Sequence, residues 1–284
     1  MGDSKNINVI LAILVALVIV EAGALAMVWG GMASVSDDLD EQILEVEATQ
    51  YLVNVSADIQ QELVLIDHAT SEAATELQGR DLNDSNAGMV LRAVANVSSN
   101  IVSVLTTDVN GTILTVQPSS FSNIIGMDIS YQDTMELALE QGRSAISPLD
   151  WVVQGYYAVY MVYPVFDDEG KINGTIAPMF RPDWMIGNIT EAQANDELSI
   201  MTLQEDGVVL YDIDEGQIGR NTFTDPIYEN FTEIKAIAHR MVDESSGVGS
   251  YSFITSGEEV RKEVIWTTVG LLGVQWTVSV IRLV

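Results

Sequence analysis

The stretch "LTTDVNGTILTV", residues 105–116, has a counterpart in "MTLQEDGVVLYD", residues 201–212. Each has an apolar run, an acidic turn that ends in Gly, and a second apolar run, which is the pattern of a β-hairpin. Downstream of each hairpin lies a helical pattern, at 131–142 and 228–247, and then a set of strand patterns. This repetition, at a spacing of about 95 residues, predicts a tandem duplication of one α+β unit.

The composition excludes several classes of protein. Hydrophobic residues make up 48% of the 284, enough for a substantial core, and there is no Cys for disulfides or thiolate chemistry. The two His, His68 and His239, lie far apart, so we expect no metal site and no cofactor. The 41 acidic and 12 basic residues give a net charge of −29, which repels nucleic acid. Such a charge is typical of the solvated acidic surface of salt-tolerant, archaeal-like proteins, and a specific cation-binding role is the alternative.

An apolar stretch near the N-terminus predicts export. Residues 9–20 and 22–29 are apolar and together are long enough to cross a bilayer. Lys5 precedes the stretch and acidic residues follow it, so we expect 1–6 in the cytoplasm, 7–30 as a transmembrane anchor and the rest outside, in a single-pass protein of the cell membrane. Because Glu21 interrupts the stretch, a cleaved signal peptide with "AGALA" at its cleavage region is the alternative.

An excess of Asn-X-Ser/Thr triplets supports export independently, since chance predicts about two. We expect several to carry glycan, although Asn and Thr also serve as ordinary turn residues. The triplets begin at Asn54, Asn83, Asn96, Asn110, Asn173, Asn188 and Asn230.

Residues 33–78 contain neither Pro nor Gly, and their apolar residues recur at helical spacing. They predict a long stalk helix, followed by a shorter helix at about 89–100 and by units at 89–190 and 195–284. Leu39, Ile43 and Val46 lie near its start, beyond what the units can cover. Apolar surface left there favours a parallel homodimer.

The order of these segments resembles the double-Cache, or tandem PAS-like, family of extracytoplasmic sensor domains. The resemblance rests on "TTDVNGTIL", "IIGMDIS", "ALEQGRSAIS", "YPVFDDEGKINGTIAPMF", "LQEDGVVLYDIDEGQIG" and "GVQWTVSVI". It implies an α+β fold in which a long N-terminal helix precedes two tandem PAS-like (Cache) modules, each an antiparallel sheet with flanking helices. The membrane-distal first module would hold a small-molecule ligand, and the membrane-proximal second module would often be empty.

The sequence departs from the family in its ligand-binding pattern and in where it ends. Amino-acid-binding members carry an Arg-x-Trp-Tyr pattern at the start of the first module's helix, where residues 132–135 here read Gln-Asp-Thr-Met. A late-strand Asp that grips the ligand's ammonium is replaced by "TIAPMF". Family receptors also continue into a second membrane helix and a cytoplasmic output domain, whereas this sequence ends at Val284, so we expect it to signal through a separate partner.

Aromatic residues concentrate in the first unit, where rings and hydroxyl groups suit a small ligand pocket. The alternative is that these Tyr residues simply pack between sheet and helix. We expect a nearly uncharged site for a neutral or weakly polar ligand, or for a carboxylate held by Tyr hydroxyls and backbone amides. Arg143 or Arg181 could pair with a ligand carboxylate, and pairing with an acidic surface residue is the alternative. The candidate ligand-binding residues are Tyr131, Met135, Trp151, Tyr156, Tyr160 and Arg143.

The sequence therefore favours a membrane-anchored, ligand-binding sensor module that forms a homo-oligomer through its stalk. The alternative is a glycosylated cell-surface or filament subunit that uses the N-terminal helix for assembly. The sequence has no Gly-rich phosphate loop with Lys, no G-x-S-x-G and no H-E-x-x-H, so we do not expect an enzyme.

Overall fold

The computed structural model describes residues 37–152, 155–193, 197–255 and 258–284. The predicted cytoplasmic segment 1–6 and anchor 7–30 lie outside the described residues, as do residues 33–36 of the predicted stalk. Among the described helices, none is long and apolar enough to cross a membrane.

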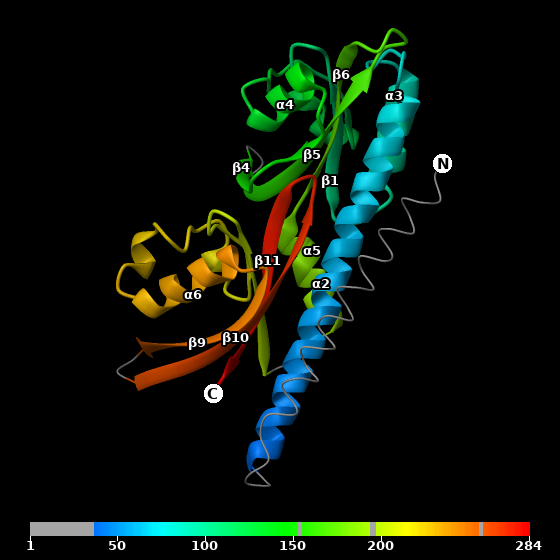
Figure 1. Ribbon diagram of the computed structural model, residues 1–284. Helices are drawn as coiled ribbons and strands as arrows, with labels where there is room; N and C mark the ends of the chain where they lie inside the picture. The colour runs from blue at the N-terminus through cyan, green and yellow to red at the C-terminus, as the bar shows by residue number, and fades with distance from the viewer. Residues whose placement is uncertain (1–36, 153–154, 194–196, 256–257) are drawn as a thin grey trace.

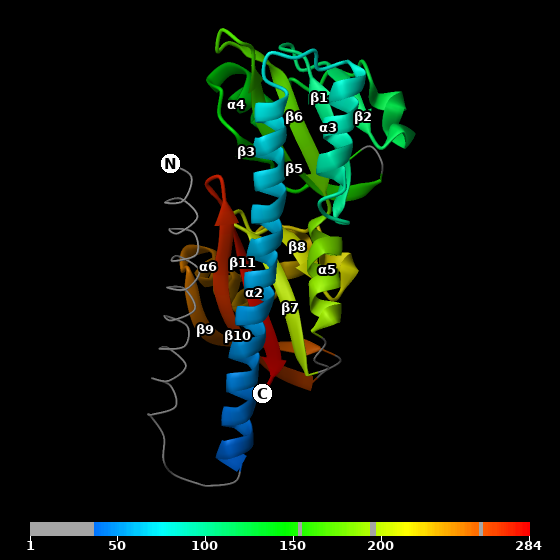
Figure 2. The ribbon, with the colours of Figure 1, turned by 90° about the vertical axis from the view of Figure 1, so that its right-hand side faces the viewer.

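Helix α2 (Asp37–Glu76) contains 40 residues and is about 60 Å long at 1.5 Å per residue. It runs along both sheets of the molecule (Figure 1, Figure 2). Near its start, Ile43 and Val46 are 47% and 48% exposed, so this end does extend past the sheets. Further along, one stripe of apolar side chains is buried: Ala48, Leu52, Val55, Ile59, Leu63, Ile66, Ala73 and Ala74.

Helix α3 (Ser85–Ala95) starts and ends earlier than the predicted 89–100. Its beginning is set by Asp84, whose side chain accepts a hydrogen bond from the Ala87 N–H at 2.8 Å. Helix α3 packs beside α2 on the same face of the first sheet.

The first sheet has the order β2-β1-β6-β5-β3, with β4 paired to β5, and every pairing is antiparallel. The 3₁₀-helix η1 (Ser119–Ile124) and helix α4 (Asp133–Gln141) belong to this unit. The strands are β1 (Ile101–Thr107), β2 (Ile113–Gln117), β3 (Ala145–Ile146), β4 (Asp150–Val152), β5 (Tyr156–Phe166) and β6 (Ile172–Phe180).

Helix α5 (Pro182–Ala192) leads into the second sheet, whose order is β8-β7-β11-β10-β9, again antiparallel. Two 3₁₀-helices, η2 (Glu215–Gln217) and η3 (Pro226–Tyr228), and helix α6 (Thr232–Asp243) complete this unit. The strands are β7 (Leu198–Gln204), β8 (Val209–Asp212), β9 (Ser246–Thr255), β10 (Glu258–Leu271) and β11 (Val274–Leu283).

The two sheets are separate and share one strand order, which confirms the predicted architecture of a long helix and two similar antiparallel sheets with flanking helices. The hairpin turns follow the predicted chemistry. Gly111 has φ +79° and Gly207 has φ +83°, a backbone region that favours Gly. In the first turn the Asp108 carboxylate accepts the N–H groups of Asn110 and Thr112, at 2.9 and 2.8 Å.

The two units share a hydrophobic core. One continuous cluster includes the buried stripe of α2 and buried residues of both sheets. At their junction, Phe180 of β6 and Trp276 of β11 lie with ring centroids 6.5 Å apart. Because the core is continuous, α2 holds both sheets in one hydrophobic assembly.

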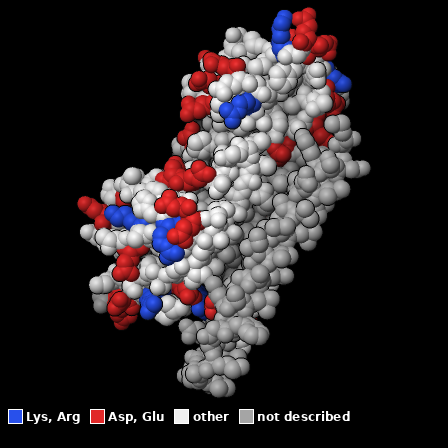
Figure 3. Space-filling view, viewed as in Figure 1, with Lys and Arg blue, Asp and Glu red and all other residues white. Residues whose placement is uncertain are grey.

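Acidic side chains lie over the loops of both units on the face that Figure 3 shows, and basic side chains are fewer. Six of the seven predicted glycosylation residues are exposed. The exception is Asn173, which is half-buried and whose amide donates to the Arg80 carbonyl at 3.0 Å.

Candidate functional site

A pocket of about 450 Å³ lies over one face of the first sheet. Its floor comes from Leu105 of β1, Tyr160 of β5, and Ala177 and Met179 of β6. The backbone register places Leu105 opposite Ala177 and Tyr160 opposite Met179, so these side chains share a face. The volume falls within the range of small-ligand pockets.

Three segments build the walls. Ile124 and the loop that follows it lie on one side, and Met135, fully buried on α4, lies on another. Strand β4 closes the third side with its three residues, Asp150, Trp151 and Val152. Because β4 pairs only with β5 among the described strands, it is an outer wall.

Four of the six candidate residues meet in this pocket: Tyr131, Met135, Trp151 and Tyr160. Tyr131 is 79% exposed and Trp151 58% exposed, so both lie at the mouth of the pocket. The structure does not bring Tyr156 and Arg143 to the pocket.

Tyr156 lies instead in a second cavity between the two units, and Arg143 is exposed on the segment after α4. Tyr156 is missing from the pocket because it starts β5, next to the second unit, whereas Tyr160 lies further along the strand, over the first sheet. The sequence pattern could not separate the two tyrosines.

The charge of the pocket differs from the sequence prediction of a nearly uncharged site. Asp128 and Asp150 are among its lining residues, and no Lys, Arg or His is among those that the structure describes there. Hydrogen bonds from Ser130, foremost from its backbone N–H, lower the pKa of Asp128, which is therefore ionised at neutral pH. Burial raises the pKa of Tyr160 to about 12, and the charge of Asp150 acts in the same direction. The pocket thus combines apolar walls with two carboxylates.

Sequence reasoning missed both carboxylates. Asp150 directly precedes Trp151, which was expected to close the site, and Asp128 lies in "IIGMDIS" shortly before Tyr131. Their positions next to predicted site residues were the sequence signal that could have identified them. Asp residues are so numerous in this chain that a local acidic residue carried little information.

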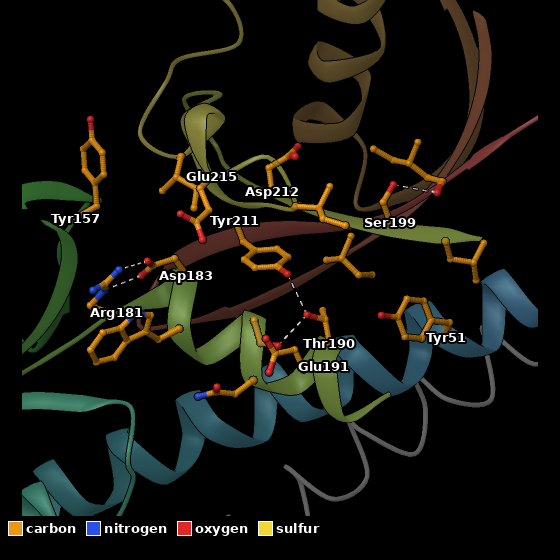
Figure 4. Close-up of a pocket in the computed structure, with 18 of the residues that line it drawn as sticks. Tyr51, Tyr157, Arg181, Asp183, Thr190, Glu191, Ser199, Tyr211, Asp212 and Glu215 are labelled. Atoms are coloured by element: carbon orange, nitrogen blue, oxygen red, sulfur yellow. Dashed lines mark hydrogen bonds and ion pairs between the residues drawn. The ribbon is translucent and has the colours of Figure 1, made fainter. Parts of the chain in front are cut away.

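A larger cavity, of about 1040 Å³, lies between the two units. Figure 4 shows Tyr157, Arg181 and Asp183 on one side of it and Tyr211, Asp212 and Glu215 on the other. The Arg181 guanidinium forms an ion pair with Asp183 and lies 4.1 Å from the Trp184 ring centre.

Some polar groups of this cavity bind one another, whereas the buried Tyr156 hydroxyl has no hydrogen-bond partner among the described residues. Besides the Arg181–Asp183 pair, Tyr211 and Thr190 are joined by a hydrogen bond of 3.0 Å between their hydroxyls (Figure 4). The pocket over the first sheet is the better candidate for a ligand, because its apolar walls and few polar groups are the usual features of a small-molecule site.

Comparisons with known proteins agree with this geometry. Residues 61–182, which include most of the first unit, match the family model described as "HK/GC/Chemotaxis protein-like, sensor domain". The comparison with curated proteins finds no match.

Several solved structures have the same fold. An extracellular ligand-binding receptor from Desulfohalobium retbaense DSM5692 is 26% identical, with a TM-score of 0.71 over 83% of this chain. The match covers 40% of that receptor's length. The ligand-binding domain of the Pseudomonas aeruginosa PAO1 amino acid chemoreceptor PctC, in complex with GABA, is 20% identical, with a TM-score of 0.59 over 86% of this chain and 99% of that one. The corresponding domain of Pseudomonas fluorescens chemoreceptor CtaA, in complex with L-alanine, is 14% identical, with a TM-score of 0.58 over 85% and 96%.

Residues 61–182 are thus similar to sensor domains of the HK/GC/chemotaxis type, and most of the chain shares its fold with extracellular ligand-binding domains of receptors. The predicted resemblance to Cache-type sensor domains is thereby confirmed, by the family model over residues 61–182 and by the fold over most of the chain.

Proposed function

We propose that this chain is a membrane-anchored extracytoplasmic sensor that binds a small ligand bearing a positively charged amine. The units would be 89–190, distal to the membrane, and 195–284, proximal to it. Residues 7–30 would anchor the chain, with 1–6 in the cytoplasm. The chain would form a homo-oligomer through α2 and would pass its signal to a separate partner protein.

One observation carries the choice of ligand. Asp128 and Asp150 border a pocket whose other described lining residues are mostly apolar or aromatic, with no Lys, Arg or His among them. An ammonium group is the partner that two carboxylates favour, and aromatic faces add cation–π attraction. A carboxylate ligand would instead meet like charge without a compensating Arg or Lys.

The neighbouring structures support an amine in a limited way. GABA and L-alanine, the compounds bound to PctC and CtaA, each carry an ammonium group. They also carry a carboxylate, for which this pocket offers no basic side chain among its described residues. We therefore favour an amine without a carboxylate over an amino acid.

Four compounds of similar size separate the alternatives: n-butylamine, 4-aminobutyrate, butyrate and 1-butanol. Binding to the full chain in detergent is measured by thermal shift and by calorimetry at pH 7. We expect n-butylamine to bind most tightly, 4-aminobutyrate next, and butyrate and 1-butanol weakly. Tighter binding of butyrate than of n-butylamine, or no binding by either amine, would rule out the proposal.

A further inference from the structure

Strand β4 is a short outer wall of the ligand pocket that pairs with β5. It consists of three residues, Asp150, Trp151 and Val152, and all three line the pocket. They pair with Ala158, Tyr157 and Tyr156 of β5, and both Asp150 and Trp151 are exposed. A strand this short needs a further contact to keep one position.

The second unit supplies that contact through Gln204, at the end of β7. The Gln204 side-chain oxygen accepts a hydrogen bond from the Leu149 N–H at 2.6 Å, and Leu149 directly precedes Asp150. Gln204 is only 6% exposed. Leu149 is half-buried, and a backbone N–H that loses its acceptor away from bulk water is costly, so this bond stabilises the start of β4.

The Gln204 side chain is itself held in place. Its amide nitrogen donates to the Asp206 carboxylate at 3.3 Å. Its backbone N–H donates to the Val208 carbonyl at 2.9 Å, and its carbonyl accepts from the Gly207 N–H at 2.9 Å. The acceptor that meets Leu149 is therefore part of the rigid β7–β8 turn.

A second contact joins the same wall to the second unit. The ring of Tyr157, the β5 partner of Trp151, packs on Gly219, where an added Cβ would lie 2.0 Å from a ring atom. The Trp151 and Tyr157 rings meet edge to face, with centroids 4.9 Å apart. Figure 4 shows Tyr157 at the cavity between the units, near the side where Arg181 lies.

We infer that Gln204 is a positioning residue of the ligand pocket, through which the second unit holds β4 in the conformation that binds ligand. This inference rests on the proposed function of that pocket. Gln204 touches no ligand and acts through the backbone of Leu149. Linkage is reciprocal, so a ligand that orders β4 must also strengthen the contact between β4 and the β7–β8 turn. Ligand binding in the first unit would thereby affect the second unit.

The test compares Gln204→Met with Thr202→Val in the full chain in detergent. Met has a similar length but no strong acceptor. Thr202 lies two residues earlier on β7, is fully buried, and its hydroxyl has no hydrogen-bond partner among the described residues. Gln204→Asn, which shortens the reach by one methylene, serves if the Met variant does not fold.

The first readout, hydrogen exchange at the Leu149 amide, needs no ligand. We expect exchange about fivefold faster in Gln204→Met, as for the loss of one hydrogen bond, and no change in Thr202→Val. The second readout is the Kd of n-butylamine, which we expect to rise about threefold or more in Gln204→Met and to stay unchanged in Thr202→Val. A lower population of the conformation in which β4 closes the pocket lowers the apparent affinity.

Unchanged exchange at Leu149 would overturn the inference, and so would faster exchange with an unchanged Kd. If the wild-type chain binds no n-butylamine, the proposed amine function fails. The exchange result then decides by itself whether Gln204 holds β4.

Discussion

Replacing Asp150 with Asn tests the electrostatic basis of the pocket. The change keeps the size of the side chain and removes its charge. Asp150 is exposed, so its attraction for a bound ammonium is that of charges in water, about 1 kcal/mol at 4 Å. We therefore expect Asp150→Asn to weaken n-butylamine binding about fivefold.

Asp128→Asn should cause a loss of similar size, because both carboxylates are exposed and each accepts one backbone N–H at 2.8 Å, from Ser130 and from Trp151. In the Asp128→Asn, Asp150→Asn double variant, the Kd of n-butylamine should be nearly independent of salt between about 0.05 and 0.5 M. Over this interval the screening length falls from above to well below about 10 Å.

The assay is calorimetry with n-butylamine on the full chain, with Glu140→Gln as the matched control. Glu140 is an exposed carboxylate on α4 that does not line the pocket. Equal affinity of the double variant and the wild type would refute the electrostatic reasoning. So would a loss in Glu140→Gln as large as in Asp150→Asn, because the effect would then come from the net charge of the surface.

Three further predictions concern the pocket wall, a half-buried carboxyl and the long helix. Trp151→Ala should weaken n-butylamine binding roughly tenfold, whereas Trp184→Ala, which removes a similarly exposed ring outside the pocket, should leave the Kd unchanged. Burial raises the folded-state pKa of Asp212 above 3.8, so its ionisation destabilises the fold at neutral pH. Asp212→Asn should then raise the melting temperature at pH 7, and this gain should vanish as the pH falls below 3.8. A gain below pH 3.8 as large as the gain at pH 7 would show that the charge of Asp212 is not the cause. The Gln60 side chain of α2 forms two hydrogen bonds with the backbone of Gly270 in β10, of 3.1 and 2.9 Å. Gln60→Ala should therefore lower the free energy of unfolding, measured with denaturant, by about 1–2 kcal/mol. An equal loss in Gln61→Ala, at an exposed position of the same helix, would contradict that assignment.

Local patterns in the sequence were enough to predict the architecture. The two hairpins, with Gly111 and Gly207 at their turns, and the apolar spacing of α2 depend on neighbours in the chain, so a sequence-based argument can identify them. The two sheets share one strand order, as expected for a repeated unit. The predicted bounds of α3 were too late in the chain, because the helix starts at the capping side chain of Asp84, and the turn before it contains several residues that can cap a helix.

The site was predictable only in part, because its residues meet across long distances in the chain. Tyr156 and Tyr160 lie four residues apart on the same face of β5, so the strand pattern could not show that only Tyr160 reaches the pocket and that Tyr156 borders the cavity between the units. Asp150 acquires its role from pairing with Ala158 and from its position near the Tyr160 hydroxyl. Gln204 is about 55 residues from Leu149 in the chain, and no local pattern connects them.

A structure of the full chain with n-butylamine would test the central claim most directly. We predict that the ligand nitrogen lies within about 3 Å of a carboxylate oxygen of Asp150 or Asp128, with the butyl chain over Tyr160 and Met135. An amine bound in the cavity between the two units, or a nitrogen in this pocket that contacts neither carboxylate, would contradict the account.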